Sequence, residues 1–468
     1  MGIFDALTTS VAGIQSQAFA IENISGNIAN SQTTGFKRVD TAFIDLVADG
    51  APTRQAAGSV LAYSRSTNQL QGGVTGNSIG TNLAISGRGL FIVDSSSGSS
   101  DGRPTFTGVD RYSRRGDFNL DQFGFLRNGA GNYLKGIPTD PVTGNRTGST
   151  PQVLQITSDF QAAQATTEIN YRANLASTPR TTAFVNGEAG GELLNASNDY
   201  SATGPFQSGD PRPAPLGGGT VNAGDNTFFL NHSIDGGGLT LFNNQGAQIP
   251  LTLRWAKTSN TSGAETWNLF YQTGQIVNGQ PPTTPIWQNV GTNYTFNTSG
   301  QLSPPVNSIS LGSITVGGQT LGGVTLRHGE AGLTQFQDSN GNVQQTQIDQ
   351  NGFSAGQLSS VAIGDGGGVI GTYTNGRTQK LADVVLANFN NPDALQRSDG
   401  NTFQSTGESG VPIISNGTNI VGSSLEGSNV DIAEEFSKLI ITQQAYTANT
   451  RVITTVNQLL QEVTNLIR

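Results

Sequence analysis

Three short motifs in this chain are of types that could carry chemistry. The first, Gly-Asn-Ser-Ile-Gly at residues 76–80, fits the G-x-S-x-G pattern in which a serine hydroxyl attacks an acyl carbon. Such a serine needs a histidine base, and the chain offers only His232 and His328. A glycine-rich lead-in to the strand-like Asn-Leu-Ala-Ile-Ser surrounds Ser78, rather than a strand-to-helix turn. We therefore interpret Ser78 as a loop residue.

The other two motifs are of types that could bind ligands. Residues 366–371 fit G-x-G-x-x-G, but an Asn-Gly turn follows where a dinucleotide site needs a helix. Residues 338–349 begin like a calcium loop, yet Val343 replaces the required glycine and no helices flank it. Three tryptophans in the middle of the chain could form a carbohydrate-binding face, although a β-sandwich core is favoured. We predict no catalytic residue, cofactor or metal site, and no enzymatic activity.

The composition of the chain argues against several classes of protein. Charged residues make up 12% of its 468 residues, against about 25% in average globular chains. A net charge of -9 with no basic stripe argues against nucleic-acid binding. The absence of cysteine removes disulfides, thiol nucleophiles and cysteine metal ligands. No apolar run approaches about 18 residues and Lys37 is the first basic residue, so we expect neither membrane insertion nor a cleaved signal peptide.

The beginning of the chain has the pattern of one amphipathic helix, which we predict over Ile3–Ala29. Its apolar or small residues recur at heptad spacing, as in a coiled-coil seam. The seam consists of Phe4, Leu7, Val11, Ile14, Ala18, Ile21 and Ile28.

The end of the chain repeats the pattern. Its seam consists of Ile432, Phe436, Leu439, Tyr446, Ile453, Leu460 and Ile467. Asp431 and Glu434 stand where the dipole of a helix N-terminus favours acids, and Ser428 gives a weak capping signal. Glu434 and Lys438 are spaced for an i,i+4 ion pair.

Between the two ends the hydrophobic period changes to two. Residues 249–255 and 266–272 alternate apolar and polar side chains, and Asn-Gly turns occur at 340–341, 351–352 and 375–376. The chain is thus predicted to be α+β and mainly β, with terminal helices that form a coiled-coil layer.

Two such helices cannot stabilise each other fully. Burying about seven apolar side chains per helix gains roughly 10–20 kcal/mol, whereas ordering about 27 residues costs roughly 40 kcal/mol. A single partner helix also leaves most of each helix surface exposed to solvent. We therefore expect the helices to be marginal in the monomer and to form fully when further copies pack around them.

Two terminal motifs resemble the signatures of the bacterial flagellar rod and hook axial proteins. The first is Gly-Asn-Ile-Ala-Asn-Ser-Gln-Thr-Thr-Gly-Phe-Lys-Arg at 26–38, and the second is the segment 425–455. The matching positions are Asn27, Ile28, Ala29, Asn30, Gly35, Phe36, Lys37, Ser428, Asn429, Val430, Asp431, Gln443, Tyr446 and Asn449. The family often has Arg where this chain has Gln444, so any ion pair of that arginine is in doubt here.

The middle of the chain narrows the resemblance. Residues 82–93 and 111–136 resemble the first β-domain shared by hook and distal-rod proteins, and residues 332–363 and 368–395 look like the return half of that domain in hook proteins. A second β-domain inserted into the first favours a hook subunit, because rod subunits are much shorter. The expected domains are 1–31 with 429–468 (helical), 32–75 with 396–428 (connecting), 76–150 with 330–395 (first β-domain) and 151–329 (inserted β-domain).

The resemblance implies a structural subunit that polymerises into the curved, flexible flagellar hook and transmits torque from rod to filament. Implied partners are further copies in a helical homopolymer, the distal rod protein, the hook cap, the hook–filament junction proteins and the flagellar type III export apparatus. Implied subunit contacts are the apolar seams, and the implied location is the extracellular basal body and hook. The alternatives are a distal-rod or hook-associated protein and a secreted carbohydrate-binding β-protein.

Overall fold

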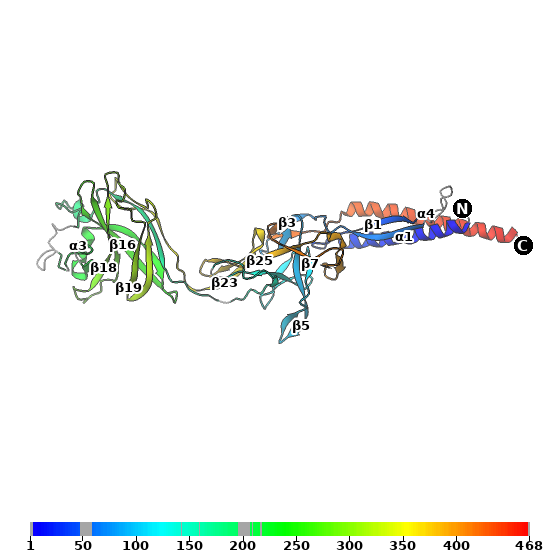
Figure 1. Cartoon of the computed structure of the whole chain (residues 1–468), viewed down its shortest axis with the longest axis horizontal. Coiled ribbons are helices and arrows are strands. Elements are labelled where there is room, and N and C mark those ends of the chain that lie inside the picture. Colours follow the sequence, from blue (N-terminus) through cyan, green and yellow to red (C-terminus); the bar gives the residue numbers. More distant parts are fainter. Residues whose placement is uncertain are drawn as a thin grey trace. The chain divides into compact units, whose positions relative to one another are not determined.

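The computed structural model describes residues 3–46, 59–141, 143–158, 160–194, 206–207, 209–215 and 218–466. These residues form a mainly β structure with one long helix near each end, as predicted (Figure 1). They group into two compact units: Met1–Asp159 with Leu358–Arg468, and Phe160–Gln357. Among the described helices, none is long and apolar enough to cross a membrane.

The two long helices of the first unit pair with each other. Helix α1 (Ile3–Ala29) has the predicted bounds, and α4 spans Ile432–Leu466. They lie side by side in Figure 1 and run antiparallel, because Gly13 lies against Asn449 whereas Asn27 contacts Glu435. The predicted Glu434–Lys438 ion pair is present at 2.9 Å.

A hairpin of strands β1 (Val39–Leu46) and β2 (Ser59–Ser66) accompanies α1. The Ser16 hydroxyl donates to the Val60 carbonyl at 3.0 Å, and the Asn23 amide donates to Thr41 Oγ1 at 2.9 Å. This hairpin lies in the segment 32–75 that we expected only to connect, and it covers one face of α1.

The β-part of the first unit is built on strands in the order β23-β24-β25-β10-β5-β7-β27-β26. Alternate residues of β5 enter different cores: Phe91 and Val93 pack in one, Leu90 and Ile92 in the other. The elements are β3 (Val74–Gly76), β4 (Leu83–Ile85), β5 (Leu90–Ser100), β6 (Arg103–Phe106), β7 (Arg111–Ser113), β8 (Phe118–Leu120), β9 (Leu126–Asn128), β10 (Asn132–Pro138), β11 (Gln152–Val153), β23 (Gly356–Ile363), η2 (Asp365–Gly367), β24 (Gly368–Tyr373), β25 (Thr378–Asn388), η3 (Pro392–Ala394), β26 (Gln396–Ser398), β27 (Thr402–Gln404), β28 (Ile413–Asn416), β29 (Ile420–Gly422) and β30 (Ser424–Glu426).

The second unit holds two five-stranded sheets, one ordered β19-β20-β13-β21 with β22 also on β13, the other β14-β18-β17-β16-β15. One buried cluster takes side chains from both sheets, so they pack as a sandwich. The elements are β12 (Phe160–Gln161), β13 (Glu168–Ala176), α2 (Thr182–Val185), β14 (Thr220–Asn222), η1 (Ala223–Asp225), α3 (Asn226–Asn231), β15 (Ile234–Phe242), β16 (Gln248–Ser259), β17 (Glu265–Gln272), β18 (Pro285–Phe296), β19 (Ser308–Val316), β20 (Gln319–Arg327), β21 (Leu333–Phe336) and β22 (Gln344–Gln350).

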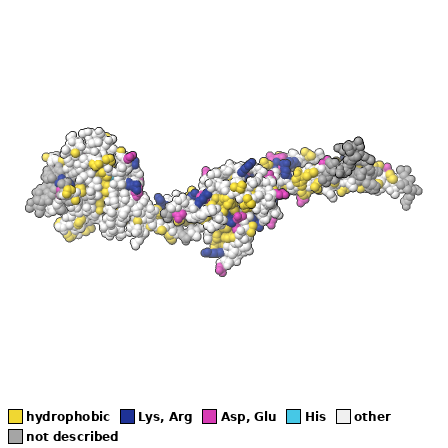
Figure 2. Space-filling model, in the orientation of Figure 1, with side chains coloured by type: hydrophobic (Ala, Val, Ile, Leu, Met, Phe, Trp, Pro, Cys, Tyr) yellow, Lys and Arg dark blue, Asp and Glu magenta, His cyan; other side chains and the backbone are white. Residues whose placement is uncertain are grey.

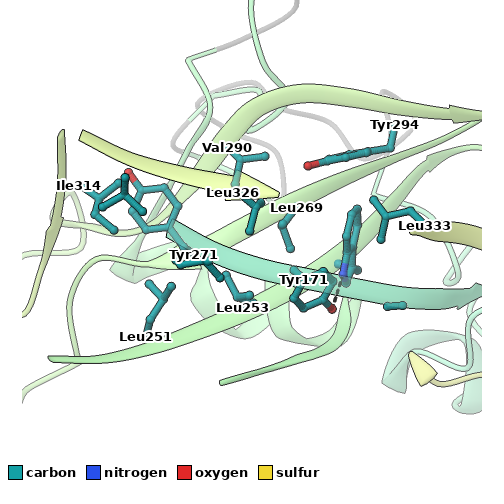
Figure 3. Packing of buried hydrophobic residues seen from close by; sticks show 14 of the residues in the cluster. Tyr171, Leu251, Leu253, Leu269, Tyr271, Val290, Tyr294, Ile314, Leu326 and Leu333 are labelled. Carbon is teal, nitrogen blue, oxygen red and sulfur yellow. Dashed lines mark hydrogen bonds between the residues drawn. The ribbon is translucent and has the colours of Figure 1, made fainter. Parts of the chain in front are cut away.

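The sandwich core contains a hydrogen-bonded aromatic group. Figure 3 shows the ring of Tyr171 from β13 among leucines of the facing sheet. The Trp255 indole donates to the Tyr171 hydroxyl at 2.9 Å, and that hydroxyl donates to the Gly236 carbonyl at 2.8 Å. All three tryptophans are buried, with Trp287 the most exposed at 4%. A tryptophan face for carbohydrate is therefore wrong. Trp255 and Trp267 lie in the sandwich core as predicted, whereas Trp287 packs in a separate buried cluster with Phe229 of α3.

The boundary of the second unit differs from the expected one. Residues 330–357, which we assigned to the first β-domain, contribute β21 and β22, and both strands pair with β13 of the second unit. Their partner lies more than a hundred residues earlier in the chain, and such pairing leaves no local pattern. After the glycine-rich stretch 366–371 the chain continues as a strand hairpin, so no dinucleotide-binding helix follows.

Candidate functional site

Helix α1 packs its small and polar face within its own chain. The buried residues of this face are Ser10, Gly13, Ser16, Ala20, Ile24 and Asn27. A Cβ added at Gly13 would stand only 3.0 Å from the Asn449 amide, so α1 and α4 approach closely there. The apolar seam predicted for α1 occupies a neighbouring face, of which only a part is covered.

The seam residues of α1 are therefore only partly covered in the single chain. Val11 is 41% exposed and Ala18 is also exposed, while Leu7, Ile14, Ile21 and Ile28 are partly buried. The Phe4 side chain lies outside the described residues. The fully buried residues of α1 are thus not those of the seam, which keeps some exposure at every described position.

Helix α4 shows the same division. Leu439, Ile453 and Leu460 are partly buried, whereas Ile432, Phe436 and Tyr446 are exposed. Ile467 lies outside the described residues. Figure 2 shows mostly uncharged polar surface on the visible face, with hydrophobic side chains interspersed along the helical pair. The structure thus brings α1 and α4 together but leaves much of both seams open.

Asn27 of the N-terminal motif joins three parts of the chain. Its side chain exchanges two hydrogen bonds of 2.9 Å with the backbone N–H and carbonyl of Val39, at the start of β1. Its amide also donates to the buried carboxylate of Glu435 at 2.9 Å. Lys438 pairs with the same carboxylate at 3.0 Å. Asn27 therefore fixes α1 against both the hairpin and α4.

The turn after α1 uses the motif residues Gly35 and Phe36. Gly35 has a φ of 66°, and an added Cβ would stand 2.6 Å from the Arg114 carbonyl carbon. Its N–H donates to the Glu426 carbonyl at 2.8 Å. The Arg397 guanidinium lies 5.1 Å above the Phe36 ring, a cation–π contact. Only glycine fits this turn, because the left-handed backbone and the close approach both exclude a side chain.

Lys37 lies in a buried ionic cluster, which we call the clasp: Lys37, Arg114 and Glu426. The three side chains are at most 3% exposed. Glu426 accepts from Lys37 Nζ at 2.5 Å, from Arg114 Nη1 at 3.1 Å and from the Gly72 N–H at 3.0 Å. Desolvation lowers the pKa of Lys37 although Glu426 opposes this effect. Lys37 is therefore a buried structural residue rather than a solvated surface charge.

The C-terminal motif closes the other side of the clasp. Asn429 Oδ1 accepts from the Arg38 N–H at 2.7 Å, and the Asn429 N–H donates to the Phe36 carbonyl at 3.3 Å. Asp431 Oδ1 accepts from two backbone N–H groups of the first turn of α4, so Asp431 caps the helix. The capping role considered for Ser428 is wrong, because its hydroxyl accepts from the Val430 N–H instead.

The remaining motif positions lie on the helices. The Asn30 amide donates to the Gly26 carbonyl at 2.9 Å and closes the end of α1. Ala29 and Gln443 are exposed, and Asn449 is partly buried opposite Gly13. Some motif residues thus hold the two ends of the chain against each other, whereas others remain exposed to solvent.

No chemical site emerges in the part of the chain that the structure describes. No group of three or more His, Cys, Asp or Glu side chains there could hold a metal ion. Asp338, at the start of the calcium-like segment, accepts from the backbone N–H groups of Asn340 and Asn342, which is the geometry of a turn.

Sequence reasoning missed two of the three clasp residues. Arg114 and Glu426 lay inside motifs that carry the family resemblance, but we assigned them no role. A charged residue inside an otherwise apolar or glycine-rich strand motif was the available signal, since such a residue is buried only when paired.

Comparison with known proteins supports the resemblance along the whole chain. Residues 421–466 match the family described as flagellar basal body rod FlgEFG protein C-terminal. The chain is 29% identical to the flagellar hook protein FlgE of Brucella abortus over 100% of both chains. It is 29% identical to that of Escherichia coli K12 and 27% to that of Salmonella typhimurium, over 98% of this chain and 100% of each relative.

A solved structure, the Helicobacter pylori flagellar hook protein FlgE2, matches with 12% identity and a TM-score of 0.46, covering 75% of this chain and 99% of that chain. The sequence matches confirm the predicted structural, non-enzymatic role and do not favour the rod or carbohydrate-binding alternatives. Over its whole length the chain is thus similar to flagellar hook proteins, and these matches support a structural subunit of the bacterial flagellar hook.

Proposed function

We propose that the chain forms the curved, flexible hook as a helical homopolymer, held together by the open seams of α1 and α4. The observation that supports this is the set of large apolar side chains exposed on two helices that already pack against each other. Among them are Val11, Ile432 and Phe436 of the seams, and Ile440, Ile441, Val452, Leu459 and Val463 at other positions of α4.

The magnitude of this exposure favours assembly of many copies. Burying a large apolar side chain gains about 1.5–3 kcal/mol. Because these side chains are roughly half covered already, eight of them would contribute about 6–12 kcal/mol per subunit. Association of two proteins costs about 4–15 kcal/mol. A single neighbour would therefore give weak binding, whereas several neighbours around each helical pair would give a stable tube.

The clasp gives the polymer its mechanical link. It ties the helical pair to the β-part of the first unit through buried charges and backbone hydrogen bonds. Force applied to the helices is thereby passed to the β-strands rather than absorbed by a loose connection. The low charge of the chain, 12% of residues, leaves uncharged polar surfaces that can exchange weak contacts as a curved tube rotates.

The domain organisation of the proposal follows the sequence expectation with one shift. The helices form an inner coiled-coil layer, and two β-rich domains lie outside, the second inserted into the first. The inserted domain is taken as residues 160–357, because β21 and β22 pair with β13. The terminal helices gain most of their stability from neighbouring copies.

The proposed partners are further copies, the distal rod protein, the hook cap, the hook–filament junction proteins and the flagellar type III export apparatus. The relatives' names place them in the flagellar hook, and we extend that location to this chain. Export to the cell exterior without a cleaved signal peptide is part of the same proposal.

Electron microscopy of purified protein after salt-induced assembly tests the proposal. Wild-type chain should form curved tubes. The double variant Val11→Ser with Phe436→Ser should not, whereas Val109→Ser, at a loop residue 55% exposed in the same unit, should assemble normally. Straight tubes would favour a rod protein, and normal tubes from the double variant would contradict the role of the seams.

A further inference from the structure

A cavity of about 300 Å³ in the first unit adjoins the clasp. Arg114 lines it together with Asn68 from the segment after β2 and Arg88 from the turn before β5. Apolar walls come from Leu90, Phe389, Pro392 and Ile413. The volume lies at the lower end of the range for ligand clefts, which suits one inserted side chain.

The charges around this cavity are unbalanced. Arg88 is exposed and makes no ion pair among the described residues. Arg114 is buried and shares the carboxylate of Glu426 with Lys37, so two cations stand against one anion. None of the residues lining the cavity carries a carboxylate. Buried charges are normally paired, and a guanidinium binds a carboxylate better than other groups.

Two buried polar atoms of the lining residues also have no partner in the described structure. They are Nε of Arg114 and Oδ1 of Asn68, in residues that are 2% and 3% exposed. An N–H donor is thus free on one wall residue and a carbonyl acceptor on another. Arg114 Nη1 and Nη2 already donate to Glu426 and to the Gly87 carbonyl. Because Nε and the Asn68 oxygen are inaccessible to solvent in the single chain, an entering segment would reach them after a small shift of both side chains.

We propose that this cavity receives an aspartate or glutamate side chain of a second copy of the chain, held between Arg88 and Arg114. The inference rests on the proposed homopolymer and adds a specific contact to it, in the first β-domain rather than on the helices.

Charge complementarity favours a second copy as the occupant. The chain has 33 acidic residues against 24 basic ones. Exposed acids without a described ion pair, such as Asp101, Glu330 and Glu408, are available for such a contact. Ile413, on the rim, is 51% exposed and would be covered by the entering segment.

Site-specific crosslinking in the polymer tests the occupant. Because the chain has no cysteine, Ile413→Cys creates a single attachment point for a benzophenone maleimide. After assembly and irradiation we expect covalent dimers, in which mass spectrometry finds the adduct on a peptide containing Asp or Glu. Dilute unassembled chain should give no dimers. Polymers without dimers, or adducts only on peptides lacking an acid, would overturn the proposal.

A matched pair of variants tests the charge. Arg88→Ala should raise the critical concentration for assembly about tenfold or more, since a charge-assisted hydrogen bond is lost. Arg103→Ala, at another exposed arginine of the same unit without a described ion pair, should leave it unchanged. Equal values for the two variants would overturn the inference alone, whereas failure of wild-type chain to assemble would overturn the proposed function.

Discussion

Replacing Glu426 by Gln tests the clasp with a minimal change of shape. The substitution keeps the volume but removes the one carboxylate that faces Lys37 and Arg114. Removing one partner of a buried ion pair costs about 3–5 kcal/mol, because the remaining charge stays buried without compensation. Here two cations remain, so we expect a loss at the upper end of that range.

Lys37→Met should cost less. Glu426 then keeps Arg114 and the Gly72 N–H, and the remaining pair is neutral. Burial already lowers the pKa of Lys37, which means that the folded chain holds this ammonium at some cost. We expect a loss of about 1–3 kcal/mol, the usual range for a charged hydrogen bond. Glu408→Gln, at an exposed acid without a described partner, is the control and should change stability by less than about 0.5 kcal/mol.

The positions of the tryptophans allow a clean assay. All three lie in the second unit, so their fluorescence during urea unfolding reports that unit alone. The far-ultraviolet circular dichroism signal has a contribution from helices α1 and α4, so it also reports the unfolding of the first unit. Glu426→Gln should shift the ellipticity transition and leave the fluorescence transition in place. A Gln variant as stable as wild type, or one that shifts both transitions equally, would refute the clasp.

Three further predictions use the same assays. His328 is 1% exposed, and desolvation lowers its pKa to about 4. Between about pH 4 and 6.5 the folded second unit therefore binds fewer protons than the unfolded chain, and its stability should fall by about 3 kcal/mol as the pH drops through that window. Tryptophan fluorescence would detect this dependence on pH, and His328→Gln should weaken it. Gly35→Ala should destabilise the first unit by more than about 2 kcal/mol, because it adds both backbone strain and a clash with Arg114. Gly102 also has a positive φ, 78°, but has open space around it, so Gly102→Ala should cost only about 1 kcal/mol in the same urea titration. Equal costs for the two variants would contradict the packing argument. Gly13→Leu should separate α1 from α4 at Asn449 and prevent tube formation in electron microscopy, while tryptophan fluorescence stays native; normal tubes would show that the helices need no close approach.

The local pattern of the sequence was sufficient to predict individual helices and strands, but not to predict which strands pair with each other. The bounds of α1 followed from heptad spacing, which is a local signal. Strands β16 and β17 likewise followed from alternation. By contrast, β21 and β22 were assigned to the first β-domain, because their pairing with β13 depends on contacts distant in the chain.

The candidate site shows the same limit more sharply. Nothing near Lys37 in the sequence indicates its burial, because its carboxylate partner, Glu426, lies 389 residues later. The heptad spacing predicts the seams as contacts between subunits, but it does not indicate that α1 packs within its own chain through Gly13 and Ala20. Helix spacing identifies apolar faces, but it does not say which neighbour covers each face.

The central claim is that α1 and α4 gain their stability from neighbouring copies. Hydrogen–deuterium exchange of the same protein as dilute chain and as polymer measures this directly, with the sandwich strands as internal reference. The account predicts that amides of Ile3–Ala29 and Ile432–Leu466 exchange rapidly in the dilute chain and slowly in the polymer, while those of β13 and β16 do not change. Strong and equal protection of both helices in the two states would contradict it.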